Sequence, residues 1–294
     1  MTLAAPAISK PASSLRLWLP LVLVFALTVL VHYDLSKNEN KHDSVIAQIV
    51  YLPASGYLKP LTFGYRSVVA DFIYLWSIQY YGDPAFRPLT QFLPRTYDLI
   101  TELDPNFLDA YGTGALFLFY EGRNPKAGLK LLDKGLEKNP AEWILPMDAG
   151  FYCLYNLRNK DLSAAYFEKA SRVPGAPTFP KRMLAGVEFK KGDKKAALQL
   201  WTEVYNEAER ASVKQTAFQH VHDLKVLIDL EELRKAIEFF RKTNGRFPYN
   251  LTQLSAGGFM TLIPQDPEED NYNYDPRTGT VKYSKELKMY SRFQ

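Results

Sequence analysis

The chain has 294 residues, of which 47% are hydrophobic and 14% aromatic; this excludes long intrinsic disorder and allows one extended domain or two compact ones. Its net charge of +4 comes from 36 basic and 32 acidic residues spread along the chain, so we expect no nucleic-acid partner. Cys153 is the single cysteine in the sequence, which excludes an intramolecular disulfide and a thiolate metal site.

The first predicted element is an apolar segment near the amino terminus, Leu17–Tyr33. It contains no Asp, Glu, Lys or Arg and reaches the lower limit of about 17 residues for a helix that crosses a bilayer. A cleaved signal peptide is the alternative, although no convincing pair of small residues follows for a cleavage site. Residues 1–16 carry Lys10 and Arg16 and no acidic residue, so the positive-inside rule places them in the cytoplasm. We therefore expect a single-pass bacterial membrane protein with most of its chain in the periplasm.

Residues 34–67 form a predicted linker and the start of an aromatic segment that covers Gly56–Gly82. Phe72, Trp76 and Tyr80 follow helical spacing, and we interpret them as a packed cap for the domain that follows. The alternative is a surface that contacts a partner or the membrane, because this window has more aromatic residues than one helix face needs. That surface would comprise Tyr57, Phe63, Tyr65, Trp76, Tyr80 and Tyr81.

The body of the chain, residues 68–210, repeats one pattern. Three segments each contain a turn, a small residue and an apolar helical stripe: Glu121–Pro140, Leu157–Pro174 and Phe189–Ala208. The small residue falls at Ala127, Ser163 and Ala197, with successive offsets of 36 and 34 residues. Because one helical hairpin cannot bury its apolar face without neighbours, we expect three to four such units.

These segments resemble the tetratricopeptide repeat family, whose unit of about 34 residues is a pair of antiparallel helices. In that family a small residue permits close helix contact, an aromatic residue four positions later fills the groove, and a proline ends the second helix. The matching positions are Ala127, Leu131, Gly135 and Pro140; Ser163, Phe167, Ala170 and Pro174; and Ala197 with Trp201. The resemblance implies a superhelix whose concave face binds a protein partner.

A long amphipathic helix or a helix pair is predicted over residues 211–244, where it would cap the repeats. Asn244 and Gly245 supply its termination, because glycine adopts the left-handed conformation that ends helices. Pro248 prevents the helix from continuing.

The last predicted unit covers residues 245–294 and combines a short helix, an acidic loop and a strand-turn-strand pattern. Four of its stretches, Gly245–Pro248, Leu251 with Leu254, Ile263–Pro267 and Tyr272–Val281, resemble in order the soluble part of major pseudopilins of type II secretion and type IV pilus-like systems. The resemblance implies a compact helix-plus-hairpin module packed on the preceding helix. The family's leader and hydrophobic assembly helix do not precede this module, so we do not expect it to polymerise into a pilus.

Few residues indicate chemistry. His220 and His222 are two positions apart, which on a helix separates their side chains by roughly 200° and does not match a helical metal-binding pair. The acidic loop lacks the glycine and spacing of an EF-hand; solvated acids are the preferred interpretation, and a calcium site at Asp266, Asp270 and Asp275 is the alternative. We expect no catalytic residue, no cofactor and no metal.

The predicted fold is mostly α: a tetratricopeptide-like superhelix of hairpins, with one amino-terminal transmembrane helix and a small carboxyl-terminal α+β hairpin module. The expected function is binding of a protein partner, as an accessory or assembly factor of a bacterial envelope system for pili, secretion or polysaccharide export. A structural subunit stably bound in an integral membrane protein complex is the alternative.

Overall fold

A computed structural model describes residues 25–30, 54–82, 90–265 and 272–290. The chain divides into two compact units, Met1–Ala54 and Ser55–Gln294. The described helix of the first unit covers residues 25–30; the rest of the predicted span Leu17–Tyr33, and residues 1–16, lie outside the described part. Among the described residues, no helix combines the length and the apolar character that a membrane crossing requires.

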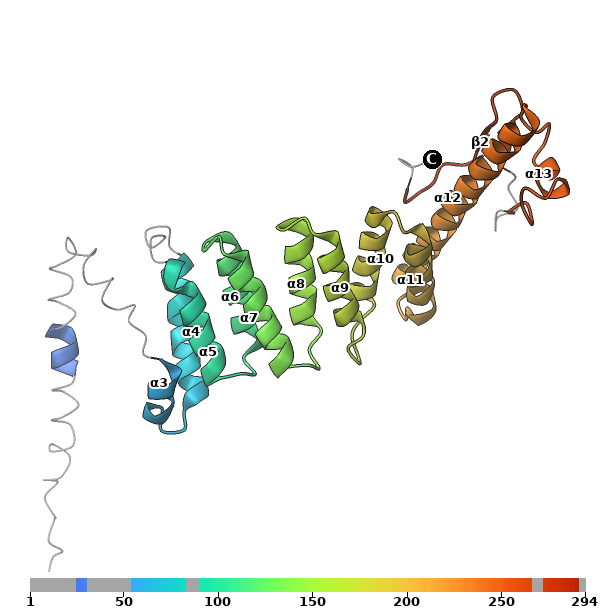
Figure 1. The fold of residues 1–294 in the computed structure, drawn as a ribbon. Coiled ribbons are helices and arrows are strands. Elements are labelled where there is room, and N and C mark those ends of the chain that lie inside the picture. Colours follow the sequence, from blue (N-terminus) through green and yellow to red (C-terminus); the bar gives the residue numbers. More distant parts are fainter. Residues whose placement is uncertain (1–24, 31–53, 83–89, 266–271, 291–294) are drawn as a thin grey trace, which may run out of the picture. The chain divides into compact units, whose positions relative to one another are not determined.

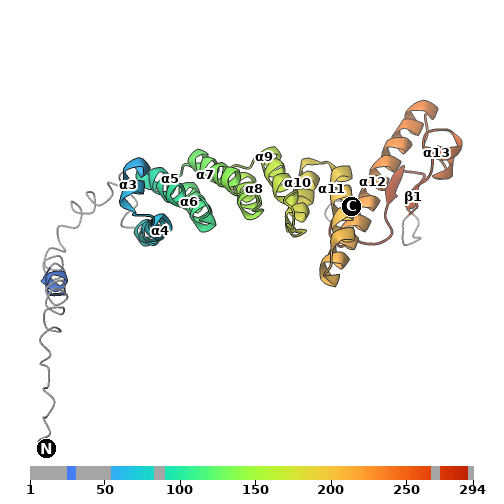
Figure 2. The same ribbon diagram turned by 90° about the horizontal axis from the view of Figure 1, so that it is seen from below.

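The second unit is mostly helical, with a small sheet near its carboxyl end (Figure 1). The helices up to the middle of the chain are α3 (Ser55–Leu61), α4 (Arg66–Gly82), α5 (Leu93–Leu103), α6 (Leu108–Tyr120), α7 (Pro125–Lys138) and α8 (Ile144–Tyr155). They are followed by α9 (Lys160–Ser171), α10 (Phe179–Lys191), α11 (Lys194–Glu207), α12 (Ala211–Asn244) and α13 (Thr252–Ala256). From α4 to α12 each helix packs against the next one, and the further contacts of α5 with α7 and of α6 with α8 join neighbouring hairpins (Figure 2).

Three helices of this series begin with the same local interaction. Asn124 precedes α7, Asn159 precedes α9 and Asp193 precedes α11, and each side chain accepts a hydrogen bond from the backbone N–H three residues later, at 3.1, 3.0 and 2.8 Å. Such capping satisfies an amide that has no partner within the helix. The second helix of each repeated segment therefore begins with the same amino-terminal capping interaction.

Glycines allow close contact between neighbouring helices. A Cβ atom added to Gly114 of α6 would lie 2.6 Å from the Tyr97 ring of α5. A Cβ at Gly150 of α8 would lie 2.5 Å from the Phe167 ring of α9, which is fully buried. Real carbon atoms do not approach so closely, so any side chain at these positions would push the helices or the rings apart.

The amino-terminal cap differs from the prediction. Phe72 on α4 is 69% exposed, so its predicted packing in a cap is wrong. The buried face of α4 instead carries Ala70 and Ser77, and the Ser77 hydroxyl donates to the Tyr97 hydroxyl at 3.0 Å. Trp76 is half-buried, whereas the side chains of Tyr80 and Tyr81 lie outside the described part. Helical spacing identified an apolar stripe on α4, but this stripe faces solvent at Phe72.

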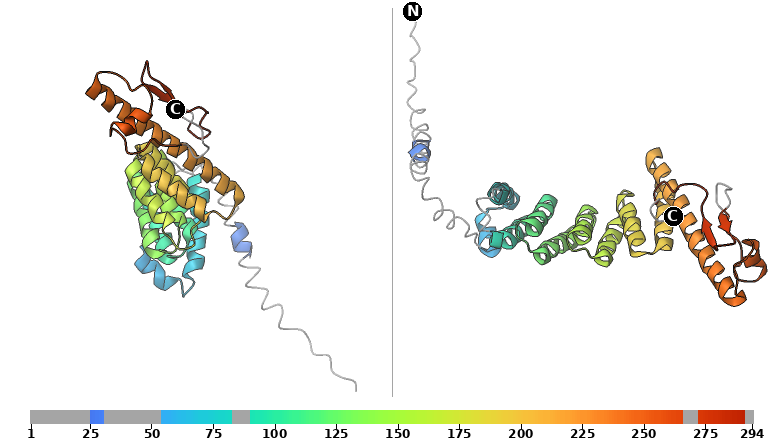
Figure 3. Two further views of the ribbon diagram at one scale, coloured as in Figure 1. Left: turned by 90° about the vertical axis from the view of Figure 1, so that its right-hand side faces the viewer. Right: turned by 90° about the horizontal axis from the view of Figure 1, so that it is seen from above.

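The carboxyl-terminal elements share one hydrophobic core with the last hairpin. The helix predicted over residues 211–244 is the single helix α12, which ends at Gly245 with φ of 69°, as expected. Strands β1 (Asn273–Asp275) and β2 (Thr280–Lys282) pair antiparallel with Tyr274 opposite Val281, and β2 packs against α12 (Figure 3). The core joins Ala185 of α10 and Trp201 of α11 to side chains of α12, α13, β2 and the segment that follows β2: Leu233, Ile237, Leu254, Val281, Tyr283, Leu287 and Tyr290.

Polar side chains of α12 hold the segment that follows β2. The imidazole of His220 stacks on Trp201 with ring centroids 3.8 Å apart, and its Nδ1 lies 2.8 Å from the Tyr290 hydroxyl. The Asp223 carboxylate accepts the backbone N–H of Met289 at 2.7 Å. Burial lowers the pKa of His220 to about 4. His220 is therefore packed against this core, and His222 lies between the Asp223 carboxylate at 3.0 Å and the Tyr283 hydroxyl at 3.3 Å.

A glycine that faces a ring should tolerate no methyl group. Gly150→Ala is expected to lower the free energy of unfolding by about 1–3 kcal/mol, because the added methyl overpacks the contact with Phe167. Gly186→Ala on α10 is the matched control: its Cβ would have no atom within 4 Å, so the change should stabilise the chain by about 0.5–1 kcal/mol. Urea unfolding followed by circular dichroism measures both effects, and equal effects would contradict the close contact.

The stacked histidine should resist protonation. Because the folded chain keeps His220 neutral, one of the four histidines should titrate with a pKa of about 4 in an NMR titration, and His220→Gln should remove that signal. The neutral form stabilises the fold, so this contribution is lost as the pH falls from 6.5 towards 4. A His220 signal that titrates near 6.5 would show that the ring is open to solvent.

Candidate functional site

The exposed large apolar side chains of the hairpins lie on one set of helices. Between the start of α5 and the end of α11 these side chains are Leu116, Tyr120, Ile144, Tyr155, Leu157 and Phe179. They belong to α6, α8 and α10 or to the turn after α8, whereas α5, α7, α9 and α11 expose none. Exposed apolar groups gathered on one side are typical of a surface that another molecule covers.

On α6 and α8 these side chains form helical stripes. Ile144, Asp148, Tyr152 and Tyr155 are separated by four, four and three positions on α8, and so share one face. Gly112, Leu116 and Tyr120 do the same on α6. The two stripes are adjacent, because a Cβ at Gly112 would lie 3.5 Å from Asp148 Oδ2 and the Tyr120 and Tyr152 rings are 6.4 Å apart. We call the combined surface of Leu116, Tyr120, Ile144, Tyr152, Tyr155 and Phe179 the aromatic face.

Ring contacts fix the side chains of the aromatic face. Tyr152 stacks on Phe119 of α6, with centroids 4.2 Å apart and an angle of 8° between the ring planes. Phe151 packs beside Tyr155, at 6.1 Å, and beside Phe179 of α10, at 6.2 Å. These contacts extend the face from α6 to α10 and reduce the conformational freedom that its side chains would lose on binding.

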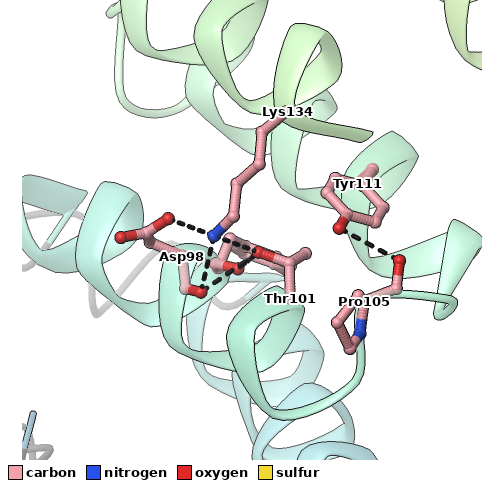
Figure 4. Close-up of polar contacts among 6 residues, drawn as sticks. Asp98, Thr101, Pro105, Tyr111 and Lys134 are labelled. Atoms are coloured by element: carbon pink, nitrogen blue, oxygen red, sulfur yellow. Dashed lines mark hydrogen bonds and ion pairs between the residues drawn. The ribbon is translucent and has the colours of Figure 1, made fainter. Parts of the chain in front are cut away.

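The other set of helices has a polar surface. Lys134 of α7 forms an ion pair with the Asp98 carboxylate of α5 and donates to the Thr101 hydroxyl at 3.0 Å (Figure 4). Further ion pairs join Lys191 of α10 to Asp161 of α9 at 3.1 Å, and Lys194 of α11 to α12 at 2.6 Å. Within the described part of the chain, no residue of α6 or α8 forms an ion pair. The described ion pairs of α5–α11 therefore avoid α6 and α8, whereas α10 carries both ion pairs and the exposed Phe179.

Asp148 is the exception on the aromatic face. Its carboxylate has neither a hydrogen-bond partner nor an ion-pair partner among the described residues, and it lies between Ile144 and Tyr152 on the stripe of α8. Burial against α6 raises its pKa to about 6, because the charged form loses water without gaining a counter-charge.

The residues that the sequence placed between repeats occupy the following positions. Leu131, Ser163, Phe167, Ala170, Ala197 and Trp201 are buried, Ala127 is half-buried, and Pro140 and Pro174 are exposed in the turns after α7 and α9. The Ser163 hydroxyl donates to the Gly150 carbonyl at 2.9 Å and so links α9 to α8. These side chains lie between helices and do not belong to the aromatic face.

The surface suggested near the amino terminus is exposed in part. Tyr57, Phe63 and Tyr65 are at least 70% exposed, and they lie on α3 and in the turn before α4. On α4 itself Phe72 is joined by Val68 and Leu75, so the exposed stripe is broader than the predicted residues. We call these six side chains the amino-terminal patch.

No described residues assemble a metal site. Asp266 and Asp270 lie outside the described part, while Asp275 uses its two carboxylate oxygens on the Arg277 N–H and the Thr278 hydroxyl, both at 2.9 Å. Within the described ranges no group of three or more His, Cys, Asp or Glu side chains is placed to hold a metal ion. Asp275 has a lowered pKa because the Arg277 N–H and the Thr278 hydroxyl stabilise its charged form.

The aromatic face was missed in the sequence, although a signal for it exists. The spacing of Ile144, Asp148, Tyr152 and Tyr155 is a visible helical stripe, but it is embedded in a segment that is apolar on all sides. Periodicity alone did not show which of these faces the neighbouring helices leave uncovered. Comparison with protein-family models and with curated protein sequences found no match for this chain.

Removal of the unpaired charge should stabilise the free chain. Asp148→Asn is expected to raise the free energy of unfolding at neutral pH by roughly 1–3 kcal/mol, because an amide avoids the desolvated charge. The difference should disappear near pH 4, because a raised pKa gives stability that is present at low pH and lost as the pH rises through about 6. Glu137→Gln on α7 is the control and should change stability by less than about 0.5 kcal/mol at either pH. Urea unfolding at the two pH values measures these differences. If Asp148→Asn is less stable than the unchanged chain at neutral pH, the Asp148 carboxylate is not an uncompensated charge.

Proposed function

We propose that this chain is a scaffold of tetratricopeptide type that holds a protein partner on its aromatic face. The observation that carries this proposal is the restriction of exposed large apolar side chains to α6, α8 and α10 among the helices α5–α11. In the tetratricopeptide interpretation of the sequence, these are the first helices of successive hairpins, and the concave face of such a superhelix binds the partner. No catalytic residue and no cofactor enter the proposal.

The setting of this scaffold is part of the proposal. Leu17–Tyr33 anchors the chain in a bacterial membrane, with residues 1–16 in the cytoplasm and the helical hairpins in the periplasm. There the chain acts as an accessory or assembly factor of an envelope system for pili, secretion or polysaccharide export. The core that joins α11, α12 and the hairpin of β1 and β2 supports a fixed attachment of the pseudopilin-like end to the repeats.

A second candidate function rests on the amino-terminal patch. Its side chains Val68, Phe72 and Leu75 form an exposed stripe on α4, the first helix of the packed series. Repeat arrays ordinarily present a polar surface at their ends. An apolar end supports the role of a structural subunit whose α4 is covered by an integral membrane protein.

Site-specific photo-crosslinking in native membranes tests the proposed function. A photoreactive phenylalanine analogue at Tyr120 or Tyr155 is expected to give one discrete protein adduct. The same analogue at Lys138, an exposed residue of α7, should give none, because that helix carries the polar surface. Adducts of equal yield at all three positions, or at Lys138 alone, would contradict binding at the aromatic face.

The same method separates the two candidates. An adduct formed at Phe72 but not at Tyr120, with an integral membrane protein that comigrates with this chain at fixed stoichiometry on native gels, would establish the subunit role instead. Circular dichroism of each variant controls for folding.

A further inference from the structure

The carboxylate of Asp148 makes no interaction that stabilises the described part of the chain. Its neighbours on the stripe of α8, Ile144 and Tyr152, are apolar or aromatic, and among the described residues the carboxylate has no partner. Among the described residues, the ion pairs of the hairpins lie on α5, α7, α9, α10 and α11, and none involves α6 or α8. A half-buried charge that pairs with nothing in its own chain weakens the fold and is available to a ligand.

The α6 surface beside the carboxylate carries no side chain at Gly112. A Cβ atom added there would lie 3.5 Å from Asp148 Oδ2, in ordinary van der Waals contact. A side chain larger than a methyl group at this position would lie against the carboxylate. Because Gly112 has none and Asp148 is only half-buried, the carboxylate stays accessible to a group from outside the chain.

Two aromatic rings lie on one side of this carboxylate. Tyr152 lies one helical turn beyond Asp148 and is fixed by its stacking on Phe119. Tyr120 lies on the adjacent stripe, with its ring 6.4 Å from that of Tyr152. Aromatic faces attract organic cations, and they bury the apolar stems of lysine and arginine side chains.

The chemistry of the ligand follows from this combination. A lone carboxylate supplies too few oxygen ligands for a divalent metal ion, which prefers several. An ammonium or guanidinium group needs only one carboxylate and gains from the rings around it. The exposed Leu116, Ile144 and Tyr155 on the same surface require apolar groups beside the cation.

We propose that the aromatic face binds an apolar segment of its protein partner that carries one lysine or arginine side chain, and that Asp148 pairs with this side chain. The inference rests on the proposed partner-binding function and adds to it the residue that determines specificity. Gly112 provides the space, Asp148 the charge, and Tyr120 and Tyr152 the rings.

Binding of short acetylated peptides to the full chain in detergent tests this assignment. The peptide pools have Lys, Arg, Leu or Glu at a central position and mixtures of Leu, Phe, Ala and Ser elsewhere. Acetylation removes the terminal amine, so only the side chain supplies a cation. The Lys and Arg pools are expected to bind about tenfold more tightly than the Leu and Glu pools, a difference of about 1.4 kcal/mol.

Variants identify the residue responsible. Asp148→Asn should reduce the preference for Lys and Arg to less than about twofold, whereas Asp148→Glu should retain most of it, because the carboxylate is kept. Glu137→Gln on α7 should bind as the unchanged chain does. Thermal melting and circular dichroism confirm that each variant is folded.

The other possible results of the peptide experiment contradict either the cation site or the whole inference. If Asp148→Asn retains the preference for cations, or if the unchanged chain binds no pool, the inference is wrong. If all pools bind equally and Tyr155→Ala abolishes that binding, the aromatic face is a docking surface without a cation site, and the proposed function stands alone. Crosslinking at Tyr120 and Tyr155 judges that function independently of the peptides.

Discussion

Close approach of neighbouring helices, at glycines that face aromatic rings, is the constraint on which the rest of the structure depends. At Gly128 of α7 a Cβ would lie 2.7 Å from the Phe119 ring of α6. Phe119 is held there, and Tyr152 of α8 stacks on it. One missing side chain therefore sets the position of α6 against α7, of the ring between them, and of the tyrosine at the surface. The aromatic face is a continuation of the core packing.

The segregation of charge gives the two sets of helices different tasks. Ion pairs such as Lys191 with Asp161 are exposed and each contributes little to stability, about 0–1 kcal/mol. Together they make the surface of α5, α7, α9, α10 and α11 polar, whereas the helices α6 and α8 of the aromatic face carry no ion pair among the described residues. The half-buried Asp148 carboxylate on this face lowers the stability of the chain when no ligand is bound. The same unpaired carboxylate therefore lowers the stability of the fold and remains able to pair with a ligand.

Local signals in the sequence were sufficient for much of the fold. The repeat over residues 68–210 corresponds to packed helices, and Gly245 ends α12 because glycine adopts the left-handed conformation, here with φ of 69°, without steric cost. The strands around Tyr274 and Val281 likewise follow from local turn chemistry. The identification of the hairpins as tetratricopeptide repeats, and of the carboxyl-terminal part as pseudopilin-like, stays a prediction.

The candidate site depends on contacts that no local pattern contains. Phe72 was assigned to a cap because its helical spacing is apolar, but spacing does not reveal which side of α4 the neighbouring helices cover. Asp148 carries a perturbed carboxylate because Gly112 and α6 lie against it, 36 positions earlier in the sequence. The raised pKa of Asp148 depends on the packing of α6 against α8, which cannot be read from the sequence of either helix alone.

The segment that follows β2 makes the two ends of the helical series different. It returns along α12 until Tyr290 lies against Phe189 of α10, with ring centroids 4.3 Å apart, so the core beyond the last hairpin is already occupied. At the opposite end, α4 presents Val68, Phe72 and Leu75 without a cover among the described residues. The carboxyl end of the series is therefore covered by the protein's own chain, whereas α4 at its beginning keeps an apolar face that no described residue covers.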